Sequence, residues 1–131
     1  MKILFTLRSF LLVGFLFCGG VSWGQAIGDF QTKSTTGNWS NFNSWNVWTG
    51  VLWTPAVLPT EIPSATTDVY IQTGHTITVD NGTAACKTIN TFANTSKISF
   101  STAGSILSVY GNLFLFSTTH SLFGTWTAGA K

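Results

Sequence analysis

The side chains best able to do chemistry in this 131-residue chain are four acids, two histidines and two cysteines. Glycoside hydrolysis, which carboxyl groups alone can catalyse, needs two of them about 5–10 Å apart. Asp68 opens a predicted strand and Asp80 precedes an Asn-Gly turn, so both have ordinary structural roles. Glu61 lies between prolines, and Asp29 lies near the start of the predicted mature chain. An enzyme built on Glu61 with Asp68 or Asp80 stays open, but we expect a protein that is not an enzyme.

Metal and cofactor chemistry find little support in the sequence. His75 and His120 lie far apart along the chain, and neither belongs to a tight cluster of metal ligands. No phosphate-binding glycine loop is present. Cys86 is either a reactive thiol or a small buried hydrophobe, and we favour the second. We therefore expect no cofactor and no metal site.

Positions 1–26 have the pattern of a secretory signal peptide. Lys2 and Arg8 precede an apolar run over positions 10–18, which is shorter than the roughly 20 residues that span a membrane. Small residues at Gly24 and Ala26 predict cleavage after Ala26. A short buried hydrophobic helix is the alternative. The pattern favours a protein that is secreted or displayed on the outer cell surface, with no membrane span after cleavage.

Removal of this segment leaves a chain with no net formal charge, because four lysines then balance four acids. Without a basic stripe to neutralise phosphates, nucleic acid is not expected as a partner. An anionic membrane surface is not expected either, since no polybasic segment is present.

The composition predicts an all-β fold. Charged residues make up 8% of the chain and hydrophobic residues 44%, which excludes ordinary disorder. The chain has 21 Thr, 13 Ser, 13 Gly and six Trp, whereas a helical bundle would be rich in Ala, Glu, Lys and Leu. A length of 131 residues allows one domain. We divide it into a signal peptide (1–26), a Trp-rich cap with a linker (27–67) and a repeat region (68–131).

The second half of the chain contains a short repeat. Small-polar pairs recur at 74–75, 93–94 and 111–112, and Ile71, Ile89 and Leu107 follow one another at equal steps (89 − 71 = 107 − 89 = 18). A fixed period of roughly this length is typical of stacked architectures, in which neighbouring units share a core. A recurring Gly or Ala followed by His or Asn suits a corner between two faces.

We therefore predict a right-handed parallel β-helix (β-solenoid) of about three short coils. A β-sandwich or an antiparallel meander is the alternative, since hairpin-paired strands could give the same spacing. The residues expected to face the core are Ile71, Ile77, Val79, Ile89, Ile98, Phe100, Leu107, Val109, Leu113 and Leu115.

A hairpin with its turn at Thr49-Gly50 is predicted in the Trp-rich region 37–59. In this register Trp48 lies opposite Val51, and Asn46 lies opposite Trp53. Exposed tryptophans could stack on the apolar faces of sugars, which makes Trp39, Trp48 and Trp53 candidate ligand-binding residues. The alternative is a hydrophobic cap that covers the open end of the first coil, and the hairpin could do both.

The segments 37–40, 44–46, 68–71 and 74–79 together resemble the N-terminal region of large secreted surface proteins of Bacteroidetes-type bacteria. The resemblance covers roughly residues 35–117, which is most of the predicted mature chain. It implies a G8-like, β-helical segment, export by type IX secretion and a role in adhesion or glycan contact, and it supplies no catalytic residues. The chain departs from the pattern because it reaches Lys131 without a recognisable sorting domain. We expect either a fragment or a small stand-alone member.

Taken together, these patterns favour a non-catalytic structural or adhesion module that is secreted or lies on the cell surface. One alternative is a carbohydrate-binding module that uses exposed tryptophans. Another is the N-terminal fragment of a larger polysaccharide-active enzyme. The partner is expected to be a glycan or another surface protein, and an open end of the β-helix would allow self-association.

Overall fold

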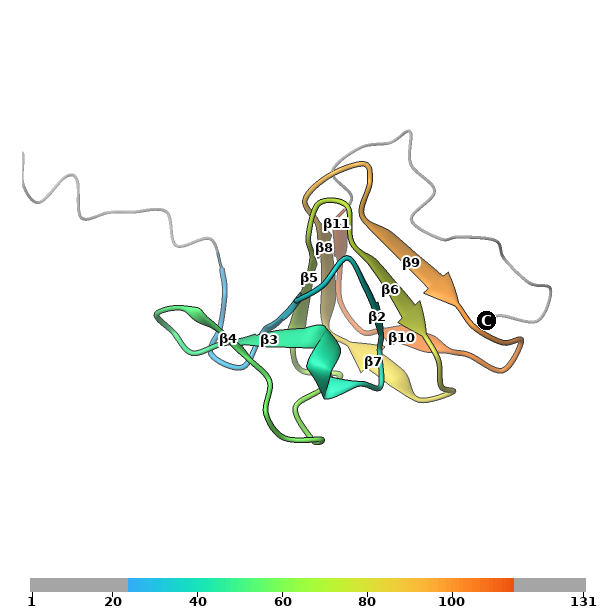
Figure 1. The fold of residues 1–131 in the computed structure, drawn as a ribbon, viewed down its shortest axis with the longest axis horizontal. Helices are drawn as coiled ribbons and strands as arrows, with labels where there is room; N and C mark the ends of the chain where they lie inside the picture. The colour runs from blue at the N-terminus through green and yellow to red at the C-terminus, as the bar shows by residue number, and fades with distance from the viewer. Residues whose placement is uncertain (1–23, 115–131) are drawn as a thin grey trace, which may run out of the picture.

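The computed structural model describes residues 24–114, and the predicted all-β class is confirmed for this part of the chain. One 3-10 turn, η1 (Phe42–Ser44), interrupts a succession of short strands (Figure 1). The strands are β1 (Phe30–Thr32), β2 (Thr36–Asn38), β3 (Trp45–Trp48), β4 (Trp53–Pro55), β5 (Asp68–Ile71), β6 (Thr76–Val79), β7 (Ala84–Cys86), β8 (Thr88–Thr91), β9 (Lys97–Phe100), β10 (Leu107–Val109) and β11 (Leu113–Phe114).

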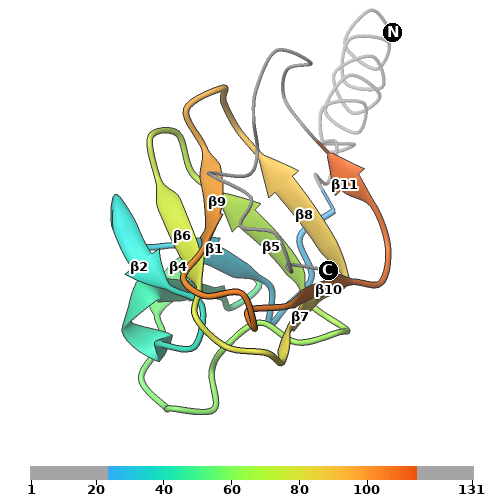
Figure 2. The same cartoon turned by 90° about the vertical axis from the view of Figure 1, so that its right-hand side faces the viewer.

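The strands form three sheets, which the chain visits in turn from β5 onward. The largest has the order β11-β8-β5-β1-β3-β4, the second the order β2-β6-β9, and the smallest pairs β10 with β7. Figure 2 shows β5 and β8 side by side, with β6 and β9 forming a second wall. Pairing is parallel among β11, β8, β5 and β1, along β2-β6-β9, and between β10 and β7. Because parallel neighbours need long connections, each strand pairs with one from an earlier passage through the same sheet.

The register of these pairs corrects the predicted spacing. Val69 lies opposite Ile89 and Ile77 opposite Ile98, so equivalent positions differ by 20 in one sheet (89 − 69) and by 21 in the other (98 − 77). Ile71 pairs with Thr91. Leu107 belongs to a different sheet, where it lies opposite Ala84. The expected column of Ile71, Ile89 and Leu107 is therefore wrong.

The corner residues explain this error. Gly74-His75 joins β5 to β6, and Ala93-Asn94 joins β8 to β9, so these two pairs are equivalent. Gly74 has a φ of +76°, a conformation that favours glycine. Gly111-Asn112 instead joins β10 to β11 and lies beside Lys87: the Gly111 amide donates to the Lys87 carbonyl at 2.7 Å. The apparent period combined two different kinds of corner.

The core lies between the three sheets and is filled by alternate strand residues. In β5 and β6 the second and fourth positions are buried, as period-two alternation requires. Five of the ten predicted core residues are fully buried: Ile71, Ile77, Val79, Ile89 and Ile98. Phe100 and Leu107 pack against them while partly exposed.

Two predicted core residues do not fit this description, and a third is not tested. Val109 and Leu113 are 38% and 44% exposed, which corrects their assignment to the core. Both lie on the last strand that the structure describes in their sheets, so no described strand pairs beyond them. Leu115 lies outside the described residues.

The Trp-rich hairpin is present, but its turn is longer than predicted. Trp48 lies opposite Trp53 instead of Val51, and Asn46 lies opposite Pro55. Positions 49–52 form the turn, which the Thr49 amide closes by donating to the Leu52 carbonyl at 3.1 Å. Trp48 and Trp53 still share a face, as expected. β3 also pairs antiparallel with β1, so the hairpin covers the edge of β1 and extends the largest sheet to β4.

Within the described range 24–114, no helix is long and apolar enough to cross a membrane.

Candidate functional site

Two partly exposed carboxylates of the described part, Asp80 and Glu61, accept hydrogen bonds from nearby donors. Asp80 accepts from the Ser40 amide and hydroxyl at 3.0 and 2.5 Å. Glu61 accepts from two amides of its own loop, and these hydrogen bonds lower its pKa. Neither Asp68 nor Asp80 is among the groups that shift the pKa of Glu61. Asp80 and Glu61 thus have local structural roles.

Asp29 is the one buried carboxylate within the described range, and it is 3% exposed. Its two oxygens accept from the amides of Ala26 (2.7 Å) and Asp68 (2.9 Å). Burial raises its pKa, which the two amide donors partly oppose. The carboxylate therefore ties the segment before β1 to the start of β5.

The remaining candidates for chemistry have structural surroundings. His75 Nδ1 lies 2.8 Å from the Thr32 hydroxyl at the corner after β5, where the repeat predicted a corner residue. Cys86 is fully buried, and burial raises its pKa to about 12. A thiol with this pKa is not nucleophilic at neutral pH, in agreement with the prediction of a small buried hydrophobe. No group of three or more potential metal ligands occurs in the part of the chain that the structure describes.

Of the three predicted ligand-binding tryptophans, Trp48 and Trp53 lie together, whereas Trp39 lies apart from them in the core. Trp39 is 1% exposed and packs edge-to-face on Trp45, with 5.2 Å between the ring centroids. Trp45 in turn donates its indole N–H to the Trp39 carbonyl at 2.9 Å. Trp39 belongs to the hydrophobic core and offers no surface to a ligand, which corrects its assignment as a ligand-binding residue. Trp48 and Trp53 are half-buried, and their centroids lie 5.2 Å apart.

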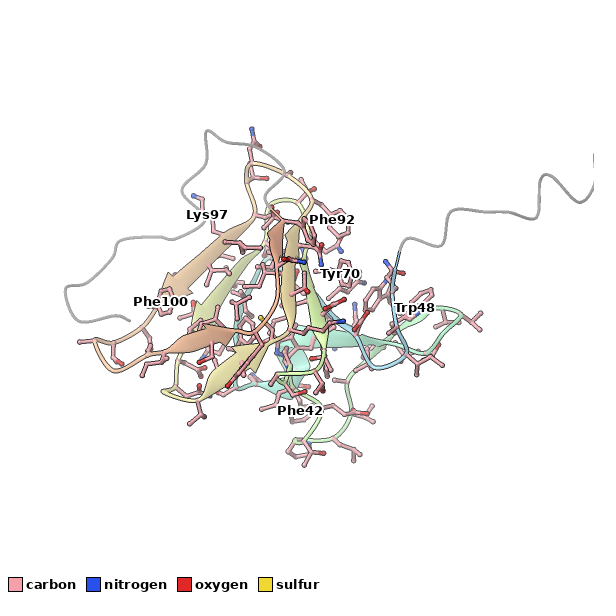
Figure 3. All side chains as sticks on the ribbon, turned by 180° about the vertical axis from the view of Figure 1, so that it is seen from behind. Phe42, Trp48, Tyr70, Phe92, Lys97 and Phe100 are labelled. Carbon is pink, nitrogen blue, oxygen red and sulfur yellow. The ribbon has the colours of Figure 1, made fainter. Side chains whose placement is uncertain are left out.

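A continuous row of aromatic side chains begins at these two tryptophans. Trp53 contacts Tyr70 of β5 edge-to-face at 5.8 Å, and Tyr70 stacks on Phe92 at 6.0 Å with 20° between the ring planes. Phe92 is 44% exposed. Figure 3 shows Trp48, Tyr70 and Phe92 on the same side of the ribbon. The row therefore crosses the outer face of the six-stranded sheet; we call Trp48, Trp53, Tyr70 and Phe92 the aromatic row.

A groove of about 680 Å³ adjoins the far end of this row. This volume falls in the range of small-molecule pockets. Tyr70, Phe92 and Phe114 supply its aromatic lining, while Thr88 and Asn90 supply polar groups from β8. These positions follow from the register, because Asn90 lies opposite both Tyr70 and Phe114.

The charges at the groove are few and of opposite sign. Lys87 Nζ lies 3.9 Å from Asp68 Oδ1, and both residues line the groove. Asp68 Oδ1 is buried and accepts no hydrogen bond from any described residue. Burial, with added repulsion from Asp29 and Asp68, raises the pKa of Tyr70 to about 12, so its hydroxyl is un-ionised at neutral pH. The site suits an uncharged ligand with both apolar and hydrogen-bonding surface.

The sequence contained a usable signal for this site that our prediction did not exploit. Tyr70 stands between Val69 and Ile71, which face the core, so period two places Tyr70 outward. Asn90 follows Ile89 in the same way. An outward aromatic residue on one strand beside an outward amide on its neighbour indicates a surface site. Recognising it required the register that the structure shows.

Comparison of the chain with protein-family models, with curated proteins and with solved structures finds no match in any of the three.

Proposed function

We propose that this protein is a non-catalytic adhesion module that is exported and built on a right-handed parallel β-helix of about three short coils. The order in which the chain visits the three sheets, and the parallel pairing along each, support this architecture. Right-handed connections are the general rule for parallel strands.

In this proposal positions 27–67 cap the helix and positions 68–131 form its coils. The pairing of β3 on β1 supports the cap, because it covers a strand edge that would otherwise expose unpaired backbone groups. Burial of Trp39 and Trp45 in the same region supports it further. Positions 115–131 lie outside the described part, so the last of the proposed coils rests on sequence alone.

Export is proposed from the sequence. A basic start, an apolar run of signal-peptide length and small residues at Gly24 and Ala26 support cleavage after Ala26. The resemblance to secreted Bacteroidetes-type surface proteins points the same way. We propose that the mature chain is secreted or held at the outer cell surface.

The observation that carries the adhesive role is the aromatic row. Large aromatic side chains on an outward sheet face are enriched at binding surfaces, because each covers much area while losing little conformational freedom. The row crosses strands from both the cap and the coils. Self-association is a further part of the proposal, since Leu113 and Phe114 on β11 are 44% and 56% exposed.

Adhesion can be tested by retention on surfaces. The purified chain is applied to insoluble polysaccharide, to washed bacterial envelopes and to protein-coated beads, and the fraction retained after washing is measured. We expect retention on at least one surface, and loss of retention in Trp48→Ala and Trp53→Ala. Tyr110→Ala is the matched control, because Tyr110 is 70% exposed and lies outside the row. Equal loss in the control, or no retention anywhere, would contradict an adhesive role.

Export is tested separately by expressing the chain with its own positions 1–26 in a Gram-negative host. Mass spectrometry of the exported protein should show an amino terminus at Ile27. A chain that stays in the cytoplasm with this segment attached would overturn this part of the proposal.

A further inference from the structure

The groove beside the aromatic row contains polar groups that lack a hydrogen-bond partner within the described chain. Asp68 Oδ1 is a buried acceptor with no donor, and only Lys87 Nζ, at 3.9 Å, lies near it. Thr88 is 7% exposed, yet its hydroxyl and the side-chain amide of Asn90 make no hydrogen bond to the described residues. Buried polar groups are normally paired, so Asp68 Oδ1 needs a partner, while the Thr88 and Asn90 groups that line the groove are open to a ligand or solvent.

The aromatic side chains on the same groove require a second property of the ligand. Tyr70 and Phe92 are nearly parallel, and Phe114 is 56% exposed beside them. An occupant must therefore offer apolar faces to the rings and hydroxyl or amide groups to Thr88 and Asn90. Pyranose sugars combine both properties, with C–H groups on the ring face and hydroxyls at the rim.

The charge of the groove disfavours strongly charged ligands. Asp68 is its one described acid and Lys87 its one described base, and they lie near one another. No excess of positive charge is available to neutralise a phosphate or sulfate polymer.

Gly24 and Gln25, which carry backbone and side-chain amides, line the groove together with Tyr70 and Asn90. The proposed cleavage after Ala26 would remove both residues. Their removal would leave this part of the groove open to a ligand.

From these observations we propose that the groove formed by Asp68, Tyr70, Thr88, Asn90 and Phe92 binds a neutral polysaccharide chain. This inference deepens the proposed adhesive function and rests on it. The proposed binding site excludes Trp39, which lies in the core. Trp53 supports Tyr70 through their ring contact at 5.8 Å.

Isothermal titration calorimetry with neutral hexasaccharides of glucose, xylose and mannose tests the proposal, with polygalacturonate and heparin as anionic comparators. We expect at least one neutral hexasaccharide to bind to the exported protein. Phe92→Ala should weaken it about tenfold or more, because loss of a central aromatic contact is costly. Thr88→Val keeps the side-chain shape but removes the hydroxyl, and should weaken binding at least about threefold.

Two controls separate binding from folding. Tyr110→Ala removes an aromatic residue outside the groove, and Thr76→Val changes a threonine on β6 of another sheet. Both should bind within about twofold of the wild type, a difference smaller than the loss of one hydrogen bond. Far-UV circular dichroism should show the same β spectrum in all four variants.

The outcomes distinguish this inference from the adhesive function itself. Retention on surfaces without binding of any neutral saccharide overturns the groove's assignment and leaves adhesion standing. Binding restricted to the anionic polymers, or to peptides eluted from the protein-coated beads, overturns it as well. Unchanged affinity in Phe92→Ala and Thr88→Val would place the saccharide elsewhere on the molecule.

Discussion

Two buried tryptophans that differ in one hydrogen bond give the sharpest prediction about stability. Trp39 and Trp45 are 1% and 0% exposed and pack on each other. The Trp45 indole N–H donates to the Trp39 carbonyl at 2.9 Å, whereas the Trp39 indole N–H is buried with no acceptor among the described residues. Replacement of either residue by Phe removes the same atoms, so the free-energy cost of the lost packing contacts and of the resulting cavity is similar in the two variants.

The hydrogen bonds then decide the difference between the two variants. Trp45→Phe leaves a buried carbonyl unsatisfied, which costs about 1–3 kcal/mol. Trp39→Phe removes a buried N–H that is already unsatisfied, which relieves a penalty of about the same size. We therefore expect Trp45→Phe to lower the free energy of unfolding by at least about 2 kcal/mol more than Trp39→Phe does.

Urea denaturation followed by far-UV circular dichroism measures this difference. The m-value should stay constant, which shows that only stability has changed. Trp48→Phe on the half-buried row is the control, and we expect it to stay within about 0.5 kcal/mol of the wild type. An equal or larger loss of stability in Trp39→Phe would refute the hydrogen-bond reasoning.

Three further predictions concern other parts of the fold. A Cβ on Gly111 would lie 2.8 Å from the Lys87 carbonyl, so Gly111→Ala should unfold at lower urea, with a loss of about 1–3 kcal/mol. Gly104→Ala, where a Cβ would meet nothing within 4 Å, should be nearly neutral in the same assay, and equal losses in both variants would contradict the steric argument. Cys86 should not react with a thiol reagent at pH 8 until urea unfolds the protein, since its pKa is about 12; labelling of the native protein would contradict this. Burial raises the pKa of Asp29 above its usual 3.8, so the folded state binds this proton more tightly than the unfolded state does. The free energy of unfolding of the wild type should therefore fall relative to that of Asp29→Asn as the pH rises from the usual aspartate range to neutrality. Urea titrations at a series of pH values measure this difference. A relative rise in the stability of the wild type would contradict the raised pKa.

The sequence predicted the fold class and much of the core because these depend on alternation within single strands. Ile77 and Val79 can be assigned to the core from their own strand alone. The hairpin at Thr49-Gly50 was predicted for the same reason, although the preference for a two-residue turn placed Trp48 opposite the wrong partner.

The register could not be predicted in this way, because it depends on the lengths of the connections. Positions 80–83 link β6 to β7, whereas the longer segment 101–106 links β9 to β10. Because these connections differ in length, the number of residues between equivalent strands is not constant. The candidate groove depends on that register, so Thr88 and Asn90 were missed together with the pairing that places them beside Asp68 and Tyr70.

Trp39 shows a second limit of local sequence. It stands between Asn38 and Ser40, whose polar side chains favour a surface position. In the structure its indole is 1% exposed and packs on Trp45. Tertiary packing decides this orientation, and the adjacent residues carry no signal for it.

The parallel stacking of β5 on β8 and of β6 on β9 is the claim on which the proposed β-helix, its cap and the groove all depend. It is tested most directly by two pairs of engineered cysteines. Thr76 lies opposite Lys97 on neighbouring parallel strands, whose spacing of about 4.8 Å suits a disulfide. The period predicted from the sequence would instead place Thr76 opposite Asn94.

The measurement is mass spectrometry of the digested protein after air oxidation. Our account predicts an intramolecular disulfide in the double variant Thr76→Cys/Lys97→Cys and none in Thr76→Cys/Asn94→Cys, with the buried Cys86 thiol unmodified in both. A disulfide only in the second variant, or in neither, would contradict the parallel register.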